Sequence, residues 1–173
     1  FNLDEGEMSG VEIELTAMPA VGLMLVANYA YLDSELDDVE NPFYDPGNPL
    51  SERIVAGGDF PYAPEHSYSL LADYTFPAFS FGVLSGNVGY NYMGDRNKDS
   101  PTTFRDSYGL VNARISLSEI EAFSGQWEIA AWGKNLGDTD YEAFTMDNLP
   151  QASRAVIWGD GRSYGIDLVY RFF

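Results

Sequence analysis

The stretch "SYGIDLVYRFF", residues 163–173, decides the fold class because every second residue is apolar. Counting back from Phe172, this apolar set is Tyr164, Ile166, Leu168, Tyr170 and Phe172. The intervening positions are mixed and include Gly165, Asp167 and Arg171. Alternation with a period of two residues is the pattern of a strand that has one apolar and one wetted face. The stretch is therefore predicted to be a strand with an apolar environment on one side.

The same alternation recurs in six earlier segments. In the first of them, for example, Val11, Ile13 and Leu15 alternate with Glu12 and Glu14. The seven predicted strands cover residues 9–17, 21–32, 66–74, 83–92, 109–117, 126–136 and 163–173. Their connections are alternately short, near residues 18–20, 75–80 and 118–126, and long, over residues 33–64, 94–106 and 137–162.

These features together predict an all-β protein, an antiparallel transmembrane β-barrel with short periplasmic turns and long extracellular loops. Strands of ~9 to 11 residues, stripes that end in tyrosine and systematically unequal connections are typical of bacterial outer-membrane barrels. A soluble β-sandwich is the alternative, since it also alternates, but it buries its apolar faces against each other. Spanning helices are excluded, because no stretch approaches ~18 continuous apolar residues.

Charge and composition exclude two further classes. The net charge is −18 with only nine Lys and Arg residues, which argues against a nucleic-acid partner because phosphate binding needs clustered basic side chains. The chain has no cysteine, so it has no disulfide framework and no thiolate metal site.

The predicted strand number indicates a piece of a larger barrel. With the short turns in the periplasm, the first predicted strand begins outside the cell, whereas complete single-chain barrels have an even number of strands. Unpaired backbone groups cost several kcal/mol each in lipid, so an open sheet needs further strands. We expect upstream sequence to supply them. Oligomerisation and an eighth strand in "ASRAVIW", residues 152–158, are the alternatives.

Five segments, in order, resemble the C-terminal part of TonB-dependent outer-membrane receptors. They are "SGVEIEL", "APEHSYSLLADY", "GLVNARISL", "WGKNLGDTDYE" with its Asn-Leu-x-Asp-x-x-Tyr strand end, and "RSYGIDLVYRF". Two positions depart from the family pattern. Gly137 stands where Phe is frequent, and Phe173 extends one residue beyond the Phe172 that the apolar register makes terminal.

The resemblance implies a barrel of about 22 strands closed by an N-terminal plug. In such receptors the outer loops and plug bind ferric siderophores, cobalamin, haem or oligosaccharides, and the TonB complex drives uptake through the plug. Residues 1–173 would be the C-terminal portion without the plug, working with outer-membrane lipid and the barrel assembly machinery. Tyr164, Ile166, Leu168, Tyr170 and Phe172 would form the assembly signal. The alternative function is a small self-contained barrel with a structural or adhesion role.

Candidate ligand-binding residues lie in the predicted outer loops, and they are Tyr44, Arg53, Tyr62, Arg154 and Trp158. The aromatic rings of Tyr44, Tyr62 and Trp158, with those of Phe60 and Phe144, would stack on a ligand. Packing within the loops explains these aromatic residues equally well. Residues 33–64 carry eight acidic residues against one basic, Arg53. We interpret this as a solvated acidic loop rather than a metal site, because it lacks the Asp-x-Asp-x-Asp-Gly spacing of a calcium loop.

A catalytic or cofactor-binding role is not expected. His66 is the only histidine and has no recognisable triad partners or further metal ligands, so a structural or interfacial role is favoured. The charged residues of the wetted faces are predicted to face the barrel lumen, and they are Glu12, Glu14, Arg114, Glu128, Lys134 and Asp167.

Overall fold

The computed structural model describes residues 6–41, 43–48, 54–55, 57–60, 62–96, 105–148 and 153–172. The described residues contain no helix that is long and apolar enough to cross a membrane. They form the strands β1 (Gly6–Ala20), β2 (Leu23–Leu36), β3 (Val39–Glu40), β4 (Ile54–Val55), β5 (His66–Thr75), β6 (Val83–Met93), β7 (Tyr108–Ala122), β8 (Gly125–Lys134), β9 (Glu142–Asn148), β10 (Ser153–Trp158) and β11 (Ser163–Phe172).

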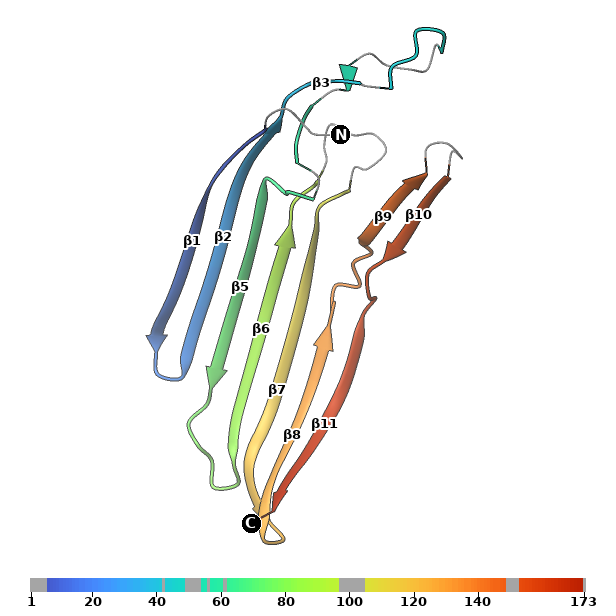
Figure 1. Ribbon diagram of the computed structural model, residues 1–173. Helices are drawn as coiled ribbons and strands as arrows, with labels where there is room; N and C mark the ends of the chain where they lie inside the picture. Colours follow the sequence, from blue (N-terminus) through green and yellow to red (C-terminus); the bar gives the residue numbers. More distant parts are fainter. Residues whose placement is uncertain are drawn as a thin grey trace.

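The seven long strands form one antiparallel sheet in the order β1-β2-β5-β6-β7-β8-β11 (Figure 1). Each of them corresponds to one predicted strand, so the strand prediction is confirmed in number and order. The short turns lie at one end of the sheet and the long connections at the other (Figure 1). This is the arrangement that the alternating connection lengths predict.

The strand register separates the side chains onto two faces of the sheet. Arg114 of β7 lies opposite Asn87 of β6 and Trp132 of β8, and we call this side the polar face. On the other side, the apolar face, Ile13 is 55% exposed and Ile166 is 78% exposed. Among the described residues, Ala130 is the one buried apolar residue. A sandwich would bury its apolar faces, so the sandwich alternative is wrong.

Aromatic rings lie at both ends of the apolar face. At the loop end, Tyr68 stacks on Tyr92 with 4.7 Å between ring centroids, and the Tyr29 hydroxyl lies 2.9 Å from Nδ1 of His66. At the turn end, Trp127 and Tyr170 have their centroids 4.6 Å apart. Two such belts flanking an apolar band are the pattern of strands that cross a bilayer.

The link predicted over residues 118–126 is mostly strand. β7 continues to Ala122, and the turn is confined to Phe123 and Ser124, which both have positive φ. The register with β8 shifts between Leu117 and Ile120. This bulge reverses the alternation in the sequence, which is why the segment has the pattern of a loop.

The long connections contain two additional hairpins, β3–β4 and β9–β10. β10 covers most of the segment considered as an eighth barrel strand, but it pairs with β9 and not with the seven-stranded sheet. The hairpin extends beyond the ends of β8 and β11, on the side away from the short turns (Figure 1). The eighth-strand alternative is therefore wrong. Within the described residues β1 and β11 pair on one side only, and the sheet is not closed.

Candidate functional site

Residues from three long connections meet beyond the loop end of the sheet. Tyr62 comes from the β2–β5 connection, Arg96 and Arg105 from the β6–β7 connection, and Thr145 from β9 in the β8–β11 connection. With their neighbours they form what we call the outer arginine cluster: Tyr62, Arg96, Arg105, Tyr108, Tyr141, Glu142, Thr145 and Arg154.

Arg105 is the centre of this cluster and is only 1% exposed. Its Nε donates to the Thr145 hydroxyl at 3.3 Å, and its Nη2 donates to the Thr145 carbonyl at 3.1 Å and to the Tyr62 hydroxyl at 3.3 Å. The guanidinium carbon also lies 4.3 Å from the centroid of the Tyr62 ring, within range of a cation–π interaction. A single side chain therefore connects all three loops.

Arg96 lies next to Arg105 across a short antiparallel bridge. The backbone N–H of each residue donates to the carbonyl of the other at 3.1 Å. Arg96 is 9% exposed, and its guanidinium carbon lies 5.5 Å from the centroid of the Tyr108 ring. Tyr108 in turn stacks on Tyr141 with 4.4 Å between centroids. Each of the two buried cations thus lies over an aromatic ring, Arg96 over Tyr108 and Arg105 over Tyr62.

Glu142 is the acidic member of the cluster, and its Oε2 already has two donors. The Thr145 hydroxyl donates to it at 2.9 Å and Nη2 of Arg154 at 2.8 Å. The ion pair of this carboxylate is with Arg154. Because Thr145 also contacts Arg105, the cluster connects Arg154 on β10 to the β6–β7 connection.

The structure brings together two of the five predicted ligand-binding residues, Tyr62 and Arg154. Tyr44 follows β3 and is 42% exposed, and Trp158 at the end of β10 is 62% exposed. Arg53 lies outside the described residues. The prediction missed Arg96 and Arg105. A usable signal was present, because these two belong to a set of only nine basic residues and lie near the two ends of the 94–106 connection.

The Asn-Leu-x-Asp segment at the end of β8 fixes where the third connection begins. Asn135 is 5% exposed and has a φ of 48°, a left-handed conformation that asparagine tolerates. Its Nδ2 donates to the carbonyls of Thr139 at 2.9 Å and Asp160 at 3.1 Å, and its Oδ1 accepts from the Thr139 N–H at 2.9 Å. Asn135 thereby ties the chain leaving β8 to the chain that returns to β11.

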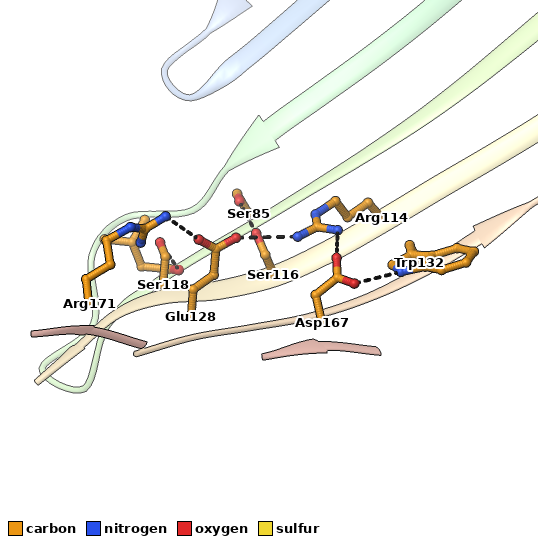
Figure 2. Close-up of polar contacts among 9 residues, drawn as sticks. Ser85, Arg114, Ser116, Ser118, Glu128, Trp132, Asp167 and Arg171 are labelled. Carbon is orange, nitrogen blue, oxygen red and sulfur yellow. Dashed lines mark hydrogen bonds and ion pairs between the residues drawn. The ribbon is translucent and has the colours of Figure 1, made fainter. Parts of the chain in front are cut away.

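A second network lies on the polar face, where charged side chains connect β7, β8 and β11 (Figure 2). Nη1 of Arg114 lies 2.5 Å from Oδ2 of Asp167, and its Nη2 lies 3.4 Å from Oε1 of Glu128. Oδ1 of Asp167 also accepts from the indole N–H of Trp132 at 3.1 Å. Arg171 pairs with Oε2 of Glu128 at 3.3 Å. The polar face is therefore a wetted wall of paired charges.

The strand register also puts the other predicted lumen residues on the polar face. Glu12 and Glu14 lie opposite Ala30 and Asn28 of β2, and Lys134 lies opposite Ser163 of β11. The described residues contain no group of three or more acidic or histidine side chains placed to hold a metal ion. The arrangement suits a polar lumen wall.

The seven long strands form a single-layer antiparallel sheet that has an exposed apolar face, two aromatic belts and a charged opposite face. These features define part of a membrane-spanning β-barrel. The family described as TonB dependent receptor-like, beta-barrel, matches residues 1–136, which is 136 of the 173 residues. The chain therefore belongs to the TonB-dependent receptor β-barrel family, and its place is the bacterial outer membrane.

One curated protein is similar to this chain in sequence, and one solved structure is similar to it in fold. The ferrichrome outer membrane transporter/phage receptor of Escherichia coli (strain K12) is 26% identical over 175 residues, covering 99% of this chain and 21% of that protein. The crystal structure of the ferric yersiniabactin uptake receptor FyuA from Yersinia pestis has a TM-score of 0.75 at 18% identity, covering 96% of this chain and 24% of that one. The chain thus spans about a fifth of the curated relative's length. Both relatives are named as transporters or receptors, not as enzymes.

Proposed function

We propose that residues 1–173 are the C-terminal portion of the barrel of an outer-membrane receptor that takes up a scarce nutrient in a TonB-dependent manner. The observation that carries the proposal is the family match over residues 1–136 together with the relatives' coverage of nearly the whole chain. Both relatives are named for ferric chelates, ferrichrome and ferric yersiniabactin. A ferric siderophore is therefore the proposed class of ligand.

The outer arginine cluster supports the ligand-binding part of this proposal. The cluster joins three connections beyond the loop end of the sheet. It combines aromatic rings with cationic groups, and these groups together suit a polar small molecule that has a conjugated π system. Tyr62 and Arg154 are the predicted ligand residues that belong to it. Tyr44, Arg53 and Trp158 are proposed as further contacts from the same loops.

Two further partners belong to the proposal. The exposed apolar stripe of β11, formed by Tyr164, Ile166, Leu168, Tyr170 and Phe172, is the proposed signal for the barrel assembly machinery. A plug domain and further strands, which pair with the edges of β1 and β11, are proposed to lie in the same polypeptide. The TonB complex then acts through that plug.

Iron uptake by living cells tests the proposed function. Cells that express the complete gene product under iron limitation are supplied with a panel of ⁵⁵Fe-labelled siderophores, with and without a functional TonB complex. We expect uptake of at least one chelate, and its loss when either the gene or TonB is removed. Uptake of every chelate at the same rate in all strains would contradict the proposal and favour the structural barrel alternative.

A further inference from the structure

We infer that Arg96 and Arg105 bind an anionic group of the transported ligand, a carboxylate or a phosphate, beyond the loop end of the barrel. The inference rests on the proposed receptor function and narrows its ligand to anionic chelates. It comes from the surroundings of the two guanidinium groups, which differ from those of the other arginines in the described chain.

The first observation is that both cations are buried with N–H groups unused. Arg96 is 9% and Arg105 is 1% exposed. Within the described part of the chain, Nε and Nη2 of Arg96 and Nη1 of Arg105 have no hydrogen-bond partner. Buried polar groups are nearly always paired, and a buried charge without a counter-charge is costly. The described residues supply no such partner, and the group that suits these N–H donors is an acceptor with negative charge.

The second observation concerns ion pairs. Arg114, Arg154, Arg162 and Arg171 each have a carboxylate within 4.0 Å, whereas none of the ion pairs between described residues includes Arg96 or Arg105. This difference occurs in a chain with 27 acidic and nine basic residues. The nearby carboxylate of Glu142 is held by Thr145 and Arg154. Among the described residues, the cluster thus keeps two cations without a carboxylate of their own.

The third observation is the geometry of the unused groups on Arg96. Nε and Nη2 form the same edge of the guanidinium plane, and this edge holds a carboxylate or phosphate through two parallel hydrogen bonds. Nη1 of Arg105, on the adjacent bridge partner, adds a third donor. Three N–H donors with two positive charges suit an oxyanion that accepts two or more hydrogen bonds rather than an uncharged acceptor.

The position of the pair favours a small molecule over a lipid head group. Arg96 lies over the ring of Tyr108, which the strand register puts on the same face as Asn112 and Arg114. This is the polar face, and the rings of Tyr90 and Tyr92 lie on the opposite, apolar face. An anion bound at Arg96 is therefore on the lumen side of the proposed barrel.

Anion binding by the complete gene product, purified and refolded in detergent free of lipopolysaccharide, tests the inference. The probes are citrate and inorganic phosphate, titrated calorimetrically at constant ionic strength. We expect saturable binding of at least one probe, weakened about tenfold or more by Arg96→Gln, which corresponds to about 1.4 kcal/mol. Arg96→Lys keeps the charge but loses the planar edge, so it should also weaken binding.

Arg96 is the decisive position because Nε and Nη2 of its side chain have no hydrogen-bond partner among the described residues, whereas Arg105 bonds to Thr145. Replacement of Arg96 should therefore disturb the loops less than replacement of Arg105. Arg162→Gln is the matched control, since Arg162 is an outer-loop arginine paired with exposed Asp138. Binding should be unchanged in this control.

Three results would overturn the inference. The first is that neither probe shows saturable binding, and the second is that the wild type and Arg96→Gln bind equally well. The third is that added lipopolysaccharide binds in place of both probes, which would assign the two arginines to a lipid head group. The ⁵⁵Fe uptake experiment separates this failure from failure of the receptor function. Uptake of neutral chelates that is insensitive to Arg96→Gln would leave the receptor standing and reject the anion site.

Discussion

The guanidinium carbon of Arg105 lies 4.3 Å from the centroid of the Tyr62 ring, which belongs to a loop 43 residues away in the sequence. The same side chain bonds to the hydroxyl and carbonyl of Thr145, 40 residues away on the other side. Arg105 thus connects loops that leave the sheet at three different places. It has a structural role in addition to any contact with a ligand.

Replacing Arg105 with Met should therefore loosen the outer loops without opening the sheet. We expect a protease added to intact cells to cleave the outer loops faster in Arg105→Met than in the wild type. The barrel should keep its heat-modifiable gel mobility, because β6 and β7 pair independently of Arg105. Arg162→Met serves as the control, and unchanged protease resistance of Arg105→Met would show that Arg105 does not hold the loops together.

Asn135→Ala should destabilise the chain near the end of β8. The substitution removes one acceptor and two donated hydrogen bonds at a site that is 5% exposed, and it puts a less tolerant residue at positive φ. Leaving buried backbone groups without partners costs about 1–3 kcal/mol. Denaturant unfolding of the complete protein in vesicles measures this loss. Asn135→Asp keeps the acceptor for Thr139 but puts a buried carboxylate against the carbonyls of Thr139 and Asp160, so it should destabilise the protein at least as much as Asn135→Ala. Wild-type stability of Asn135→Asp would contradict the assigned contacts.

Arg114 and Asp167 should be coupled on the polar face. Arg114→Gln removes the cation that lies between Glu128 and Asp167, whereas Asp167→Asn leaves Arg114 paired with Glu128. We therefore expect Arg114→Gln to lower the unfolding midpoint in urea more than Asp167→Asn does. The double variant should lose less than the sum of the single losses. Strict additivity would show that the pair does not interact in the folded barrel.

The strands of the barrel wall were predictable from the sequence, whereas of the outer site only Tyr62 and Arg154 were predicted. Alternation along 163–173 and 9–17 is a local pattern that burial in a bilayer imposes on neighbouring residues. The bulge between Leu117 and Ile120 breaks that pattern, so the end of β7 has the appearance of a loop. The contacts of Arg105 depend on residues 40 and 43 positions away, and no local period indicates them.

The final strand allows a test of its proposed role in assembly. Phe172 shares the apolar face with Tyr170 and is 81% exposed, whereas Phe173 lies outside the described residues. Alternation in the sequence predicts that Phe173 belongs to the other face. Phe172→Ala should therefore reduce insertion of the barrel into the outer membrane more than Phe173→Ala, as measured by the amount of heat-modifiable protein. Equal defects would show that the assigned register of the signal is wrong by one residue.

The most direct test of the central claim is the heat-modifiable gel mobility of residues 1–173 refolded alone into lipid vesicles, compared with that of the complete gene product. The sheet formed by the described residues has unpaired edges at β1 and β11, and unpaired backbone groups in lipid cost several kcal/mol each. We predict a compact, heat-sensitive band for the complete product and none for residues 1–173 alone. A compact, heat-sensitive band from the short chain alone would show a closed small barrel and contradict the account.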